Sequence, residues 1–126
     1  MDPKALIEAA QSARAHAYAP YSTYQVGAAV LGGSGRIYSG CNVENTSYGL
    51  TVCAERVAIL KAISEGEREI VALLVASENG ATPCGACRQV LFEFGPTARV
   101  LLSGADGTQK ELTLDDLLPD AFTLRK

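Results

Sequence analysis

The sequence predicts an α/β fold in which a mixed sheet carries helices on its faces. Residues 4–18 place apolar or small side chains at helical spacing, and residues 70–77 and 98–104 are continuous apolar runs of strand length. A further helical segment lies between the two runs, and strands separated by helices in this way form a sheet that helices cover. The 126 residues are enough for one hydrophobic core, so we expect a single domain over residues 1–126.

The first part of the chain is predicted to contain a helix, a hairpin and a loop. The helix over residues 4–18 should end before Pro20, because the residue before a proline disfavours the helical conformation. Residues 24–31 and 36–43 are strand-like and flank a GGSG turn, which predicts a β-hairpin. The polar residues 45–51 that follow are predicted to form a loop.

Two further helices are expected to begin at threonine caps. Thr51 can cap a helix over about residues 52–65, which is apolar on most sides and should therefore be buried. Thr82 can cap another helix, which has Pro83 at its first position and runs to about Phe94.

The remaining segments complete the sheet. Residues 70–77 suit the middle of a sheet, because they are apolar without interruption, and residues 98–104 are predicted to form a second buried strand. A short edge strand near 109–112 and a short helix over 113–118 are expected before the C-terminal tail.

Charge and hydropathy argue against two classes of partner. The formal net charge is −3, whereas proteins that bind nucleic acid polymers are usually basic. The sequence has no polybasic stretch for a membrane surface and no apolar run long enough to span a membrane. Residues 1–16 lack the apolar centre of a signal peptide, so a cytoplasmic location is expected.

The spacing of three cysteines predicts a metal site. In a reducing compartment, closely spaced cysteines indicate a metal or a redox centre before a disulfide. With the threonine caps expected above, Cys53, Cys84 and Cys87 fall in the first turn or two of two separate helices. Helix N-termini lower thiol pKa values and stabilise thiolates, which zinc requires from sulfur ligands. The alternatives are a redox pair or two ordinary buried thiols at the CxxC.

The number of protein ligands distinguishes a catalytic zinc site from a structural one. Three protein ligands leave a position open for water, as in catalytic zinc sites, whereas a structural site uses four. Only His16 or Cys41 could supply a fourth ligand of these types, and neither is close in sequence to the three cysteines. Cys41 follows a strand-like stretch, where a cysteine is more often a small core residue.

Two charged residues follow Cys53 directly. Glu55 does not share the helical face of Cys53, so it is a poor ligand but could act as a general base beside the open position. Its alternative is an ordinary solvated glutamate, although this helix is otherwise mostly apolar. Arg56 can donate hydrogen bonds to a zinc-bound sulfur, and its alternative is a surface salt bridge.

These motifs together resemble the short, single-domain cytidine deaminases of pyrimidine salvage. Six segments carry the resemblance, in the family's order and over nearly the whole chain: YAPYS (18–22), VGAA (26–29), GCNVENTSYG (40–49), CAE (53–55), PCGACRQ (83–89) and LLPDAF (117–122). The resemblance implies a three-layer α/β/α sandwich around a mixed five-stranded sheet. It also implies one Zn²⁺ per chain on Cys53, Cys84 and Cys87, Glu55 as the proton shuttle, and a homotetramer with shared active sites.

The resemblance also implies the residues that bind the substrate. Asn42 and Glu44 would hold the ribose, chiefly its 3′-hydroxyl; an amide and a carboxylate suit a hydroxyl, although such residues are also common in solvated loops. The backbone at Ala54 would read the base.

The remaining implied contacts are aromatic. Tyr24 would pack against the pyrimidine; the family more often has phenylalanine here, and the added hydroxyl needs a partner if it is buried. Tyr48 and Phe122 would reach the site of an adjacent subunit.

The expected reaction is hydrolytic deamination of cytidine and deoxycytidine to uridine and deoxyuridine with release of ammonia. The alternatives are a blasticidin-type deaminase on the same scaffold and a structural zinc module for protein interaction. Editing of a polynucleotide is disfavoured, because the chain is short and acidic and lacks a basic, aromatic surface stretch.

Overall fold

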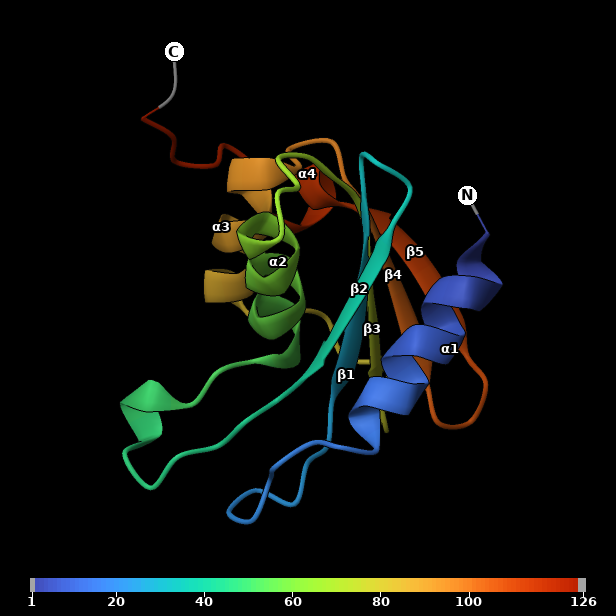
Figure 1. Ribbon diagram of the computed structural model, residues 1–126, viewed down its shortest axis with the longest axis vertical. Coiled ribbons are helices and arrows are strands. Elements are labelled where there is room, and N and C mark those ends of the chain that lie inside the picture. Colours follow the sequence, from blue (N-terminus) through green and yellow to red (C-terminus); the bar gives the residue numbers. More distant parts are fainter. Residues whose placement is uncertain (1, 125–126) are drawn as a thin grey trace.

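The computed structural model describes residues 2–124 and contains a mixed five-stranded sheet between two helical layers (Figure 1). The elements in chain order are α1 (Pro3–Arg14), β1 (Gly27–Gly32), β2 (Ile37–Cys41), the 3₁₀ turn η1 (Tyr48–Leu50), α2 (Ala54–Ser64), β3 (Ile70–Ser77), α3 (Gly85–Phe94), β4 (Arg99–Gly104), β5 (Gln109–Thr113) and α4 (Leu114–Leu117). Helix α1 covers one face, and α2 and α3 cover the other (Figure 1). The expected α/β/α sandwich is confirmed. No helix within residues 2–124 has the length and apolar character needed to cross a membrane.

The strand order is β2-β1-β3-β4-β5. Strands β1 and β2 form the predicted antiparallel hairpin, β3 lies at the centre of the sheet, and β5 lies at one edge. Only the β3–β4 pair is parallel among the described strands, with Leu73 opposite Val100. The sheet is therefore mixed, and β3 is buried on both faces, as its continuous apolar sequence predicts.

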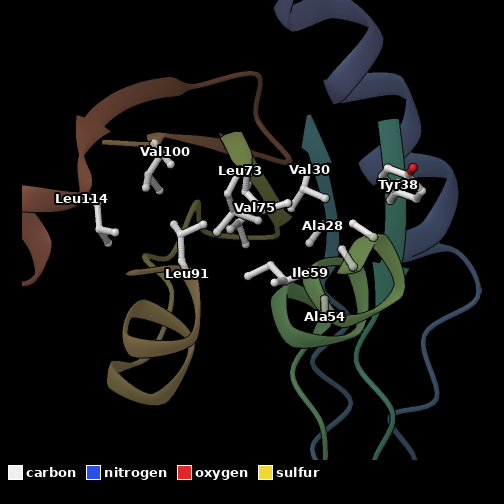
Figure 2. Close-up of a cluster of buried hydrophobic side chains, with 14 of the residues drawn as sticks. Ala28, Val30, Tyr38, Ala54, Ile59, Leu73, Val75, Leu91, Val100 and Leu114 are labelled. Atoms are coloured by element: carbon white, nitrogen blue, oxygen red, sulfur yellow. The ribbon is translucent and has the colours of Figure 1, made fainter. Parts of the chain in front are cut away.

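Alternate residues of the central strands enter two separate cores. On the α1 face, Leu74 packs with Leu6 and Leu101. On the other face, the cluster in Figure 2 lies between the sheet and helices α2 and α3, and includes Ala28, Val30, Ala54, Ile59, Leu73, Val75, Leu91 and Val100. This second core fixes both helices whose N-termini carry the cysteines.

Helix α2 lies very close to the sheet because β2 has a glycine beneath it. A Cβ atom at Gly40 would lie 2.8 Å from the backbone nitrogen of Ala58 and 2.8 Å from a methyl group of Val57. Only the sheet-facing side of α2 is buried, and Leu60 is 50% exposed on the other side. The expectation that the whole helix is buried is therefore wrong.

Two elements near the N-terminus are shorter than the sequence predicts. Helix α1 ends at Arg14 instead of Tyr18, because the backbone N–H of Tyr18 donates to the carbonyl of Asn42, 3.0 Å away. Strand β1 begins at Gly27 instead of residue 24, because the Asn42 side chain takes the hydrogen bonds that a partner strand would make. Its Oδ1 accepts from the N–H of Val26, and its Nδ2 donates to the carbonyl of Tyr24.

The predicted threonine caps are also wrong. Val52, the first residue of the helix expected after Thr51, instead exchanges two backbone hydrogen bonds with Val43, and Thr82 Oγ1 accepts a hydrogen bond from Arg88. The N-cap residues of α2 and α3 are Cys53 and Cys84 themselves. The thiols therefore lie closer to the helix ends than the sequence predicts.

A buried carboxylate ties the segment after α2 to the β1–β2 hairpin. Glu67 is 8% exposed and accepts hydrogen bonds from the Ser34 hydroxyl and from Tyr38 Oη, the latter at 3.0 Å. We expect Glu67→Gln to lower the melting temperature by roughly 5 °C at neutral pH, since a neutral amide accepts weaker hydrogen bonds than a carboxylate.

The effect of Glu67→Gln should depend on pH. The Ser34 hydroxyl, with help from Tyr38 and the Arg36 charge, holds the pKa of the Glu67 carboxyl below its ordinary 4.5. A lowered folded-state pKa stabilises the protein fully above about pH 4.5, and this stabilisation is lost as the pH falls through the folded-state value. The melting temperatures of the wild type and of Glu67→Gln, measured by calorimetry at neutral pH and at a pH below the folded-state pKa of Glu67, check the prediction. Equal melting temperatures at neutral pH would contradict it.

Candidate metal centre and active site

Three thiols from two helices converge at the edge of the second core. Cys53 is the N-cap of α2, Cys84 is the N-cap of α3, and Cys87 lies in the first turn of α3. The Sγ atoms of Cys53 and Cys84 are 3.9 Å apart, those of Cys84 and Cys87 are 3.4 Å apart, and all three lie within 4.8 Å of one another. The structure thus brings the three predicted ligands together.

The arrangement of sulfur atoms fits zinc. A tetrahedral ion with Zn–S bonds of 2.3 Å holds its sulfur ligands about 3.8 Å apart, close to the separations found here. The unpaired N–H groups at the start of each helix supply partial positive charge beside the thiolates. The donor set is therefore suited to Zn²⁺ both in geometry and in charge.

The three thiols change one another's pKa values. A hydrogen bond from Cys87 lowers the pKa of Cys53 to about 5, with further contributions from Arg56 and Cys84. The pKa of Cys87 is raised by that same hydrogen bond and by burial. A lowered pKa makes the Cys53 thiol easier to deprotonate, and a deprotonated thiol is the form that binds a metal ion.

Arg56 lies beside this cluster, as the sequence predicts. Its Nη2 donates to the Sγ of Cys53 at 3.5 Å, and this contact raises the pKa of the guanidinium. Its Nε is buried and has no hydrogen-bond partner among the described residues. Arg56 is thus placed to offset the negative charge of the sulfur ligands, and the surface salt bridge considered for it is not found among residues 2–124.

A fourth side-chain ligand is not found in the described part of the chain. The groups of His, Cys, Asp and Glu within residues 2–124 that could jointly hold a metal reduce to Cys53, Cys84 and Cys87. Cys41 is free and half-buried on β2 and is not part of this group. The three-sulfur set leaves one tetrahedral position for another ligand, as in catalytic sites.

Glu55 lies in the first turn of α2, next to the metal-binding thiols. Its side chain is 5% exposed and lines a pocket of about 240 Å³ together with Cys53 and Cys84. Burial, reinforced by the charge of Cys53, raises the pKa of the Glu55 carboxyl to about 7. A carboxyl of this kind can both accept and donate a proton near neutral pH, which a proton shuttle requires. It is not the solvated helix glutamate considered as the alternative.

The pocket lies where α2 and α3 begin, at the carboxyl end of β3. Its lining residues come from four segments: Ser22, Tyr24 and Val26; Asn42 and Glu44; residues 51–55; and Val75, Ser77, Ala81, Thr82 and Cys84. The lining thus includes the sulfur ligands, one buried carboxyl and several hydrogen-bonding groups, with apolar side chains between them. Small-molecule sites commonly have this composition.

Asn42 and Glu44 both line the pocket, and both also hold the loop before β1. The amide of Asn42 bonds to the backbone of Tyr24 and Val26, as described above. The Oε1 atom of Glu44 accepts from the N–H groups of Tyr21 and Ser22 at 2.9 and 3.1 Å, and its other oxygen accepts from the Ser22 hydroxyl. These contacts lower the pKa of the Glu44 carboxyl, the Ser22 hydroxyl contributing most.

Tyr24 and Ala54 line the same pocket. Ala54 is fully buried at the first position of α2, between Cys53 and Glu55. The hydroxyl of Tyr24, which the sequence left without a partner, donates to Oδ1 of Asn79 at 2.5 Å.

Tyr48 and Phe122 lie away from the pocket of their own chain. Tyr48 is 75% exposed in η1, where its ring meets that of Tyr21 edge-on with centroids 6.0 Å apart. Phe122 is 69% exposed, and its backbone carbonyl accepts from Gln89 on α3 at 2.9 Å. Neither ring is among the lining residues of the pocket.

The sequence reasoning missed several residues that shape the site. Ser22 holds Glu44, Asn79 holds Tyr24, and Arg88 holds the segment before Cys84 by donating to the carbonyl of Pro83 and to Thr82 Oγ1. Each of these contacts depends on where the chain folds back on itself. No local pattern in the sequence signals them, except that Arg88 follows Cys87 directly.

Comparison with known families identifies related proteins. Residues 1–103 match the family model described as "Cytidine and deoxycytidylate deaminase zinc-binding region". A cytidine deaminase of Halalkalibacterium halodurans is 50% identical over 126 residues, covering 98% of this chain and 96% of the relative. One from Sporosarcina psychrophila is 48% identical, covering 98% and 93%.

Solved structures show the same relationship. The crystal structure of cytidine deaminase from Burkholderia pseudomallei superposes with a TM-score of 0.92 at 50% identity, covering 97% of this chain and all of that one (100%). Cytidine deaminase from Mycobacterium tuberculosis gives a TM-score of 0.85 at 44% identity, covering 98% and 99%.

Proposed function

Since the chain belongs to the cytidine and deoxycytidylate deaminase zinc-binding family, we propose that it deaminates cytidine and deoxycytidine by hydrolysis. The products are uridine or deoxyuridine and ammonia, which places the enzyme in pyrimidine salvage. The whole chain acts as one catalytic domain. The observation that carries the proposal is the placement of the buried Glu55 carboxyl beside three converging thiols at the floor of a pocket.

The metal-binding, proton-transferring and charge-balancing roles in the reaction fall to different residues. Cys53, Cys84 and Cys87 hold the zinc ion, which when bound supplies Lewis acidity for the activation of water. Glu55 accepts a proton from the attacking water and delivers it to N3 of the cytosine as the water oxygen bonds to C4. Glu55 then transfers the second proton of that water to the amino group, which leaves as ammonia. Arg56 offsets the charge of the sulfur ligands throughout.

The rest of the pocket orients the nucleoside. The ring of Tyr24 stacks on the pyrimidine, the backbone at Ala54 hydrogen-bonds to the base, and Asn42 and Glu44 bind the ribose through its 3′-hydroxyl. Binding through the 3′-hydroxyl makes no demand on the 2′ position, so ribose and deoxyribose are both accepted.

The charge of the pocket favours a nucleoside over a nucleotide or a polymer. Arginine and lysine are absent from the lining residues, while Glu44 contributes a carboxylate with a lowered pKa. A phosphate group would therefore meet negative charge without a cation to balance it. The net charge of −3 acts in the same direction against nucleic acid polymers.

The active form is a homotetramer whose sites are completed by neighbouring subunits. The loops before β1 and after β2 extend beyond the end of the sheet (Figure 1). They expose Tyr18, Tyr21 and Tyr48, at 55%, 49% and 75%, and Phe122 is similarly open. Clusters of exposed aromatic side chains are typical of subunit interfaces. At such an interface, Tyr48 and Phe122 reach the pocket of the neighbouring subunit.

The chemistry of the ligands suits the cytoplasm. Three free thiols bind zinc only while they remain reduced, and a reducing compartment keeps them so. We therefore assign the enzyme to the cytoplasm.

A substrate panel tests the proposed function. Ammonia release and ultraviolet absorbance are measured with cytidine, deoxycytidine, deoxycytidine monophosphate and a blasticidin-type nucleoside, on protein whose zinc content per chain is determined in parallel. The expected result is turnover of the two nucleosides, with the nucleotide weaker by at least about tenfold because of its uncompensated phosphate charge. Zinc-loaded protein that leaves cytidine unchanged would disprove the proposal.

A further inference from the structure

A hydrogen bond joins a pocket-lining residue to a residue that is far away in the sequence and lies outside the pocket lining. Tyr24 lies on one wall, in the loop before β1, and its hydroxyl donates to Oδ1 of Asn79. Asn79 belongs to residues 78–84, the segment that leaves β3 and ends at the metal ligand Cys84. The bond therefore joins the wall that carries an aromatic ring to the segment that carries a sulfur ligand.

Asn79 is itself part of a short hydrogen-bond chain. Its Oδ1 also accepts from the Ser77 hydroxyl at 3.4 Å, and the N–H of Ala81 donates to the same hydroxyl oxygen at 3.0 Å. Ser77 is 2% exposed, and both Ser77 and Ala81 line the pocket. The Tyr24 hydroxyl is thus connected through Asn79 and Ser77 to the buried end of β3 and to Ala81, which also lines the pocket.

The part of this segment next to Cys84 is fixed by different contacts. Arg88 donates to the carbonyl of Pro83 at 2.7 Å and to Thr82 Oγ1 at 3.0 Å. A third donation, to the carbonyl of Leu117 at 2.8 Å, anchors Arg88 to the end of α4. The position of Cys84 therefore does not depend on the Tyr24–Asn79 bond, which can be removed without disturbing the sulfur ligands.

We propose that Asn79 is a positioning residue for substrate binding, which holds the Tyr24 ring in place for the pyrimidine by accepting the hydrogen bond of its hydroxyl. This inference rests on the proposed function. Asn79 does not line the pocket and acts only through Tyr24. The bond is made equally in the substrate complex and in the transition state, so it contributes to KM and not to kcat.

A double-mutant cycle tests the inference. Tyr24→Phe keeps the ring and removes the donor, Asn79→Ala removes the acceptor, and the double variant removes both. Each single variant should raise KM for cytidine about fivefold, the effect of one ordinary hydrogen bond, with kcat within about twofold of wild type. The double variant should resemble either single variant, because the second change removes nothing further.

Two more variants separate positioning from general stability. Asn79→Asp retains an oxygen that accepts the Tyr24 hydrogen bond, and it should keep KM within about twofold of wild type. Tyr38→Phe is the matched control: it removes a tyrosine hydroxyl that donates to the buried Glu67, and neither residue lines the pocket. This control should lower the melting temperature and leave KM unchanged.

The outcomes are distinct from those of the function test. If wild-type protein turns over cytidine but both single variants keep its KM, or the two effects multiply in the double variant, the inference is wrong and the proposed function stands. A single variant that lowers kcat at constant KM also overturns the inference. Wild-type protein that does not deaminate cytidine removes the proposed function and this inference with it.

Discussion

Glu55→Gln should lower kcat for cytidine by at least about 10³-fold while the zinc content stays at the wild-type value. The glutamine has nearly the same size and fits the same buried position, but it cannot accept a proton from water or deliver one to the base. Removal of a positioned general acid–base group costs up to about 10⁴-fold, and here one group serves several transfers. KM should change little, because the loss affects proton movement and not the contacts to ring or sugar.

The measurement is steady-state deamination with zinc analysis of the same samples. Glu67→Gln is the matched control, because it makes the same chemical change at another buried glutamate, which does not line the pocket. Assayed well below its melting temperature, the control should keep kcat within about twofold of wild type. A Glu55→Gln enzyme with more than a tenth of wild-type kcat would remove Glu55 from the mechanism.

Cys84→Ser should abolish zinc binding without unfolding the protein. Cys84 is the N-cap of α3, and serine is among the best N-cap residues, so the helix keeps or gains stability at its start. The hydroxyl, however, does not replace a thiolate as a zinc ligand at neutral pH. We expect zinc affinity to fall by more than about 100-fold, because mutation of a residue that only hydrogen-bonds to a zinc ligand already costs up to that much. Activity should be lost together with the metal.

Metal analysis and competition with a chromogenic chelator measure this loss. Cys41→Ser is the control, because Cys41 is a free, half-buried cysteine on β2 that lies outside the thiol group. That variant should keep one zinc ion per chain and wild-type activity. Retention of zinc by Cys84→Ser, or its loss from Cys41→Ser, would mean that the assigned ligand set is wrong.

The sequence carried enough information for the layers of the fold and for the metal ligands. The apolar run of β3 predicted a strand buried on both faces, and the spacing of Cys53, Cys84 and Cys87 predicted one site formed by two helices. Both signals are local patterns that the packing then reinforces. Glu55 was identifiable because a carboxyl in an apolar helix needs a reason to be there.

The boundaries and the pocket walls could not be predicted because tertiary contacts decide them. Thr51 and Thr82 are good caps by residue type, but pairing of Val52 with Val43 and the donation by Arg88 shift the helix starts to the cysteines. Asn42 shortens β1 by bonding to its backbone with a side chain. The partner of Tyr24 is 55 residues away, and only the folded chain reveals it.

Cys53 and Cys84 lie at the starts of two helices that precede and follow β3 in the chain, and this placement has a consequence for assembly of the protein. The unfolded chain brings only Cys84 and Cys87 together, so a complete cage for the ion exists only after both helices have docked on the sheet. Uptake of the ion is then a late event that cross-links distant parts of the chain, and by mass action a higher free zinc concentration raises the free energy of unfolding.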